Sequence, residues 1–90
     1  MSDPQWHVLV TGPARRQIDR LPVAVAAAVI ETLGAIADNP RRLGKPLRFE
    51  LEGYWSARRG PYRIVYRIDE ASHTISVLGV GHRADVYRPR

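Results

Sequence analysis

The stretch from Gly53 to Asp69, GYWSARRGPYRIVYRID, constrains the fold more than any other part of this chain. Two runs of β-branched and aromatic residues meet there at Arg59-Gly60-Pro61. Gly followed by Pro between such runs is a short-range turn signal. The sequence therefore predicts an antiparallel hairpin whose arms are Tyr54 to Arg58 and Tyr62 to Asp69.

Arginines occupy one face of this predicted hairpin. Because side chains alternate along a strand, Arg63 and Arg67 are expected on the face opposite the core. Arg63 should lie near the turn, beside Arg58 or Arg59, and no acidic residue occurs between Gly53 and Arg67. Guanidinium groups without nearby carboxylates favour an anion such as phosphate. The core face is expected to carry Tyr62, Ile64, Tyr66 and Ile68.

The first half of the chain predicts one strand and two helices. Trp6 to Thr11 alternates as a strand does, and we expect it to be central or near-central in the sheet. Gly12-Pro13 opens a helix, because proline suits the first helical position. Pro22 divides the region and starts a second helix from Val23 to about Asp38, which Asn39-Pro40 stops.

The second half predicts the remaining strands. Leu47 to Leu51 alternates and leads towards the hairpin, and Thr74 to Val80 forms the last strand, which continues to His82-Arg83. The fold class is α+β: an N-terminal strand, an αα-hairpin, and then a three-stranded antiparallel meander that completes one sheet, in a single domain over residues 1–90. On regular alternation, one face of the last strand carries Ile75, Val77, Gly79, Gly81 and Arg83. Glycines in a strand indicate close approach of a ligand or a bulge.

Charge and composition limit the classes of partner that this chain is expected to bind. Residues 41–90 carry ten Arg and one Lys against five acidic residues, a balance of +6, whereas residues 1–40 balance at −1. A cationic, β-rich half favours a polyanionic partner, although an arginine-biased surface is the alternative, since only one of the fourteen basic residues is Lys. The connector 41–46, RRLGKP, is either a solvated loop or a cationic rim.

Several other classes of function are not favoured. The chain has no Cys, and its three histidines, His7, His73 and His82, are scattered without the spacing of a metal site, so no metal and no cofactor are expected. No phosphate-binding Gly-rich loop, signal peptide or membrane span is recognised, so the expected location is the cytoplasm, with no membrane partner.

The segments GPYRIVYRID and ISVLGVGHRADVYR, preceded by strand, helix, helix and strand, resemble the RelE side of the RelE/ParE toxin superfamily over nearly the whole chain. This resemblance implies a toxin of a type II toxin–antitoxin system that cleaves messenger RNA in the ribosomal A site, without a metal, through the RNA 2′-hydroxyl. Matched by residue, the implied catalytic residues are Arg63, Arg83 and Tyr87. The residues that we expect to bind RNA are Arg58, Arg59, Lys45 and His82.

The resemblance also implies partners and leaves alternatives open. The partners are an acidic antitoxin, messenger RNA on the ribosome, and an operator bound by the toxin–antitoxin complex through the antitoxin. The lysines that some family members carry before the hairpin turn are absent here, so either their role in activating the 2′-hydroxyl passes to Arg58, Arg59 or His82, or activity is weaker. The alternatives are a ParE-like inhibitor of DNA gyrase without RNase activity, and a catalytically degenerate module that binds only the antitoxin.

Overall fold

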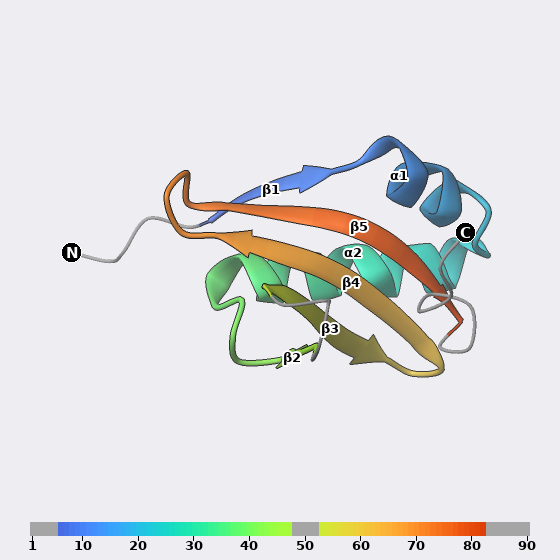
Figure 1. Ribbon diagram of the computed structural model, residues 1–90. Helices are drawn as coiled ribbons and strands as arrows, with labels where there is room; N and C mark the ends of the chain where they lie inside the picture. Colours follow the sequence, from blue (N-terminus) through green and yellow to red (C-terminus); the bar gives the residue numbers. More distant parts are fainter. Residues whose placement is uncertain (1–5, 48–52, 83–90) are drawn as a thin grey trace.

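The computed structural model describes residues 6–47 and 53–82, which form one mixed sheet with two helices packed on one of its faces (Figure 1). The described strands lie in the order β1-β5-β4-β3-β2. The elements are β1 (His7–Val10), α1 (Gly12–Asp19), α2 (Val23–Asp38), β2 (Lys45–Pro46), β3 (Tyr54–Arg59), β4 (Tyr62–Asp69) and β5 (Thr74–His82). The predicted α+β class, αα-hairpin and antiparallel meander β3-β4-β5 are confirmed.

β1 lies at an edge of the sheet and not near its centre, so that prediction was wrong. It pairs in parallel with β5, with His7 opposite Thr74 and Val10 opposite Val77. The prediction failed because alternation of side chains reports which face is buried and carries no information on which strands are neighbours. At the other edge, β2 adds a short antiparallel strand beside β3; the rest of the predicted strand 47–51 lies outside the described residues, except Leu47.

The N-terminus of α1 is tied to the sheet by Thr11. Its hydroxyl donates a 2.7 Å hydrogen bond to the Val77 carbonyl of β5 and accepts a 3.5 Å bond from the Ala14 N–H. Thr11 is therefore the N-cap of α1 and also connects that helix to β5 through a hydrogen bond. One turn later, Gln17 accepts a 2.7 Å hydrogen bond from the Val80 N–H, beyond the point where β1 ends.

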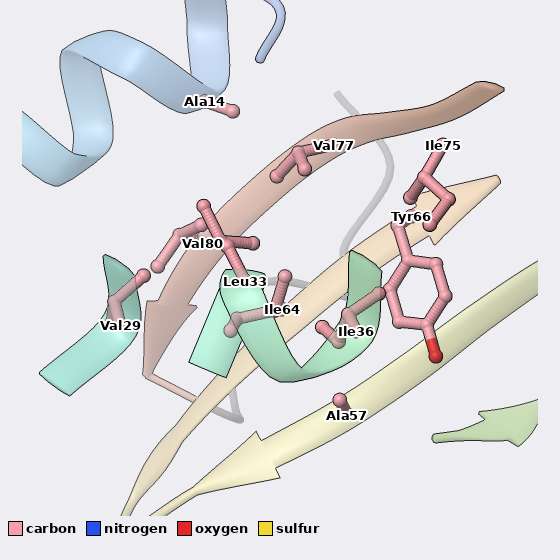
Figure 2. Close-up of a cluster of buried hydrophobic side chains, with 10 residues drawn as sticks. All are labelled: Ala14, Val29, Leu33, Ile36, Ala57, Ile64, Tyr66, Ile75, Val77 and Val80. Carbon is pink, nitrogen blue, oxygen red and sulfur yellow. The ribbon is translucent and has the colours of Figure 1, made fainter. Parts of the chain in front are cut away.

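The core lies between the helices and the sheet (Figure 2). Val29, Leu33 and Ile36 on α2 supply the buried stripe that their spacing predicts. The sheet contributes Ala57, Ile64, Tyr66, Ile75, Val77 and Val80. Neither helix in the described part of the chain is long and apolar enough to cross a membrane.

Tyr66 is the largest of the fully buried side chains. Its hydroxyl donates a 2.6 Å hydrogen bond to the Pro40 carbonyl, just past the end of α2. Burial raises the pKa of Tyr66 to about 12. The loop passes so close to this ring that a Cβ on Gly44 would overlap the Tyr66 hydroxyl and stand 3.1 Å from the Ser56 carbonyl oxygen.

The β5 strand contains a bulge that changes which residues share a face. Val65 pairs with Gly79 and Tyr66 pairs with Val77, so Leu78 has no partner on β4. Ile75, Val77 and Val80 are consequently all buried, so of the two alternatives left by the glycines the bulge is present, and the alternation through Gly79 and Gly81 is not regular. Gly81 instead lies opposite Arg63.

Candidate nucleic-acid interface

The hairpin turn decides which arginine accompanies Arg63. Gly60 and Pro61 form a two-residue loop, and Gly60 has a positive φ of 58°, as the first central position of a type II′ turn requires. This loop fixes the register, so that Arg58 lies opposite Arg63. Both project from the sheet face opposite the helices. We call it the arginine face; along β4 it carries Arg63 and Arg67.

Arg59 projects from the helix-covered face and does not join that pair. Its Nη1 lies 2.9 Å from Glu31 Oε1 and donates a 3.3 Å hydrogen bond to the Thr32 hydroxyl, both on α2. Of the two arginines expected beside Arg63, Arg58 is therefore the one that lies there, and the charge of Arg59 is balanced by Glu31 on the helix-covered face. The RNA-binding role of Arg59 stays a prediction. Sequence reasoning missed Glu31, although it is the only charged residue between Val23 and Ala37.

Two adjoining hollows lie at Arg58 and Arg63, which line both of them. The larger, of about 450 Å³, extends towards the connector after α2, and the smaller, of about 270 Å³, opens at the hairpin turn. The additional residues of the larger hollow are Leu43, Lys45, Pro46, Leu47 and Ser56. The smaller adds Gly60, Pro61 and His82. Lys45 and His82 are thus brought to the same site as the two arginines, from opposite sides.

The basic residues of the connector 41–46 have different surroundings. Lys45 opposes Ser56 on β3 and lines the larger hollow, as the cationic-rim reading requires. Arg41 instead forms an ion pair with Glu70 and lies 5.8 Å from the centre of the Trp6 ring. Only part of the basic connector contributes to the candidate interface.

The electrostatics of the site favour an anion. No carboxylate occurs among the described residues that line either hollow. Arg63 is half-buried, with its Nε atom buried, whereas Arg58 is exposed. Because charges interact more strongly away from bulk water, a phosphate contacting both guanidinium groups would be held mainly by Arg63. Gly81 has no side chain to obstruct access to Arg63 from β5.

His82 lies at the end of β5, opposite Tyr62. The two rings meet edge to face, with centroids 6.0 Å apart and planes at 72°. His82 is exposed and lines the smaller hollow, so it reaches solvent and the arginine pair together.

The remaining candidates lie elsewhere. Arg83 and Tyr87 fall outside the described residues. His73 stacks on Trp6 at the β4–β5 turn, with ring centroids 3.9 Å apart, and has a positive φ of 54°. Within the described residues, no group of three or more His, Cys, Asp or Glu side chains is placed to hold a metal ion.

Comparison with known proteins identifies the family. The profile of the family described as "ParE toxin of type II toxin-antitoxin system, parDE" matches residues 8–87. Two toxins of Mycobacterium tuberculosis strain H37Rv are similar in sequence. "Toxin RelE" is 47% identical over 87 residues, 96% of this chain and 90% of the relative, and "Toxin RelG" is 51% identical over 84 residues, 92% of this chain and 97% of the relative.

A solved structure gives the same result. The crystal structure of the toxin–antitoxin complex RelBE2 from M. tuberculosis contains a chain that is 47% identical and superposes with a TM-score of 0.83, covering 89% of this chain and all of that chain. Its architecture agrees with the fold described above. The chain therefore belongs to the RelE-like toxins of the type II toxin–antitoxin systems.

Proposed function

We propose that this toxin is a ribosome-dependent mRNA endoribonuclease that stops translation and growth until its antitoxin neutralises it. The observation that carries the proposal is the pairing of Arg58 with Arg63 across the hairpin, on hollows whose described lining holds no carboxylate. Such a pair is suited to a phosphodiester whose charge increases during reaction. Lys45 adds a third cation at the rim of the larger hollow.

The proposed reaction needs no metal. The RNA 2′-hydroxyl gives its proton to a base and attacks the adjacent phosphorus, and the bond from phosphorus to the 5′-oxygen breaks as that oxygen takes up a proton. Arg63 and Arg58 stabilise the charge on the phosphorane, because their donors are already in place before the reaction. The products are a 2′,3′-cyclic phosphate and a 5′-hydroxyl.

Three further residues complete the proposal. Arg83 orients the phosphate or assists the leaving oxygen, and Tyr87 orients the 2′-hydroxyl and stacks on a base, as the family resemblance implies. His82 lines the hollow beside the two arginines, where a proton carrier is useful. Much of the rate would come from the ribosome, which holds the message in line for attack. The site of action is then the cytoplasm.

The direct test compares purified toxin acting on programmed ribosomes and on the same message free in solution. We expect cleavage in the A site, with 2′,3′-cyclic phosphate ends found by mass spectrometry and no loss of rate in EDTA. Equal cleavage of free RNA would indicate an ordinary ribonuclease. Ends bearing 3′-hydroxyl groups would contradict attack by the 2′-hydroxyl.

A second candidate function is inhibition of DNA gyrase. It is favoured by the family profile, whose description names a ParE toxin. A supercoiling assay on the same preparation separates the two functions. Inhibition of supercoiling, together with intact message on programmed ribosomes, would select the gyrase inhibitor.

We also propose that an acidic antitoxin binds this toxin and that the complex binds its own operator through the antitoxin. A shallow groove of about 230 Å³ lies between α2 and the hairpin turn, lined by Ala24, Val25, Ala28 and Val29 together with Arg59, Gly60, Pro61 and Tyr62. Beside it, Val23 is 87% exposed and Ile30 59% exposed. Apolar antitoxin side chains would bury this surface while acidic residues approach the arginine face.

Stopped-flow association with the antitoxin, measured across a salt series, tests this arrangement. Surface charges are screened beyond ~8–10 Å at physiological ionic strength, so the on-rate should fall as salt rises. Val25→Asp in the groove should accelerate dissociation. An on-rate that is indifferent to salt, with Arg63→Ala binding as the wild type does, would show that the antitoxin neutralises the toxin without covering the arginine face.

A further inference from the structure

The arginine face continues along the hairpin beyond the two hollows. On β4, Arg67 follows Arg63 by four positions on the same face, and Tyr54 of β3 lies directly opposite Arg67. Neither Arg67 nor Tyr54 lines the hollows at Arg58 and Arg63. The hairpin thus presents two cross-strand pairs, Arg58 with Arg63 and Tyr54 with Arg67, joined by the pair Ser56 and Val65.

The spacing of the two pairs suits a single nucleic-acid strand. Four residues of antiparallel strand span about 13 Å, which an extended RNA strand covers in about two nucleotides. Ser56 and Val65, which lie between the pairs, have short side chains that do not extend as far from the sheet as those of Arg63 and Arg67. A strand bound at Arg63 can therefore continue along β4 to Arg67.

Tyr54 and Arg67 also have the chemistry of a nucleotide subsite. Tyr54 is half-buried on a backbone held on both sides, by β4 and by the Leu47 N–H, which donates a 2.8 Å hydrogen bond to the Tyr54 carbonyl. An aromatic ring carried by a backbone held in this way can serve as a platform on which any base stacks. Arg67 is exposed beside it, and its guanidinium can contact a phosphate or the face of the same base.

An acidic residue, Asp69, marks the far end of this surface. Asp69 shares the face of Arg67 two residues further along β4. Hydrogen bonds from Ser72, from its backbone first, hold the pKa of the Asp69 carboxyl below its usual range, with a smaller contribution from Arg67. The carboxylate therefore stays charged and repels phosphate beyond Arg67. The cationic surface runs from the hairpin turn to Arg67 and ends there.

We propose that Tyr54 and Arg67 form a second subsite for single-stranded RNA, holding a base and a phosphate about two nucleotides from the phosphodiester bound by Arg58 and Arg63. The inference rests on the proposed ribonuclease function and deepens it. The subsite binds and positions the message, and neither residue touches the reacting atoms. Its contribution should therefore appear in affinity for RNA and depend on the length of the strand.

The test measures binding of 2′-deoxy-substituted, fluorescently labelled oligonucleotides of two to six nucleotides by anisotropy, with no cleavage required. Wild-type toxin should gain affinity as the strand becomes long enough to reach both pairs. Tyr54→Ala should lose roughly five-fold to a hundred-fold of affinity for the long oligonucleotides, the range expected for one base–aromatic stack, and bind the dinucleotide as before. Tyr54→Phe keeps the ring and should bind as the wild type does. If circular dichroism shows that Tyr54→Ala is unfolded, Tyr54→Leu replaces it in the measurement, because leucine keeps an apolar side chain but lacks the ring.

Arg67→Ala gives an independent measurement, because it removes a charge from an exposed position. The slope of log affinity against log salt should decrease in magnitude by about 0.7, the value for one phosphate contact on a single strand, whereas Tyr54→Ala should leave the slope unchanged. Arg20→Ala, an exposed arginine next to α1, controls for net charge.

Two outcomes would overturn the subsite: variants that match the wild type at every oligonucleotide length, or a wild-type toxin whose affinity does not rise with length. Either result can coexist with cleavage on programmed ribosomes, so the subsite can fail while the proposed ribonuclease function stands. If wild-type toxin did not cleave messenger RNA on programmed ribosomes, the proposed ribonuclease function itself would be rejected.

Discussion

Arg58 and Arg59 are chemically identical neighbours whose environments differ because a strand alternates its side chains. Arg58 faces Arg63 across the hairpin, and Arg59 pairs with Glu31 on α2. The first is the residue that we propose stabilises a phosphate. The second stabilises the contact between the hairpin turn and the helix.

This difference makes the two residues a matched pair of substitutions. Arg58→Ala should lower cleavage on programmed ribosomes by ~10²–10³-fold, the effect of removing one preorganised donor, with stability nearly unchanged. Arg59→Ala should leave cleavage within a few-fold of the wild type and lower the free energy of unfolding by at most about 1 kcal/mol, because its ion pair is exposed to solvent. Single-turnover kinetics and urea denaturation measure the two effects. Equal losses of activity in both variants would contradict the assignment of faces.

Two glycines provide a second matched pair. A Cβ on Gly44 would overlap the Tyr66 hydroxyl, so Gly44→Ala should destabilise the protein by about 1–3 kcal/mol, as overpacked core positions do. Gly34 is exposed in α2, and a Cβ there would meet no other part of the molecule within 4 Å, so Gly34→Ala should stabilise the helix by up to about 1 kcal/mol. Urea denaturation of both variants should show shifts of opposite sign. A neutral Gly44→Ala would mean that the loop can move away from Tyr66 at little cost.

At the scale of elements, Thr11 joins the end of β1, the start of α1 and the middle of β5. Its backbone N–H and its hydroxyl both donate to the Val77 carbonyl, and the hydroxyl also caps the helix. Thr11→Ala should lower the free energy of unfolding by about 1–2 kcal/mol, whereas Thr11→Ser, which keeps the hydroxyl, should lose much less. Hydrogen exchange should show the loss concentrated in α1 and β1. Equal destabilisation by both variants would assign the effect to the methyl group and not to the cap.

The helices and strands also show which features of the fold can be predicted from the sequence. The hairpin was predicted because its turn and its alternation are local signals, and the fixed two-residue loop then places Arg58 opposite Arg63. The edge position of β1 was not predicted, and the glycines of β5 left a bulge as only one of two alternatives, because both features depend on neighbours distant in sequence. Sequence alone likewise left Arg58 and Arg59 equivalent, since the partner that separates them, Glu31, lies on another element.

At the scale of the whole molecule, Tyr66 makes the free energy of unfolding depend on pH. Its pKa is raised to about 12, and an unfolded tyrosine titrates near 10, so the stabilisation is fully present below pH 10 and is lost as the pH rises towards 12. The free energy of unfolding should fall by up to about 3 kcal/mol across this interval. Urea denaturation from pH 8 to pH 12 measures the slope.

Tyr66→Phe is the decisive variant for this dependence. This substitution should remove the part of the pH dependence of the free energy of unfolding that ionisation of Tyr66 causes. It should also lower the free energy of unfolding at neutral pH by about 1–2 kcal/mol, because the Pro40 carbonyl loses its donor. Tyr54→Phe, on the opposite face of the sheet, is the control and should keep the slope. An unchanged slope in Tyr66→Phe would show that other groups govern alkaline unfolding.

The parallel pairing of β1 with β5 has a consequence for the time at which the toxin becomes complete. Thr11 bonds to a residue 66 positions later in the chain, so this contact cannot form until nearly the whole protein has left the ribosome. Contacts of such long sequence separation form slowly, because loop closure must be achieved before they stabilise the chain. The contacts of the β3-β4 hairpin are local, and both helices precede it in the chain, so β5 is the last of its supporting elements to be synthesised. The arginine pair therefore gains its complete scaffold only once β5 has been made and has closed the long-range contact with Thr11.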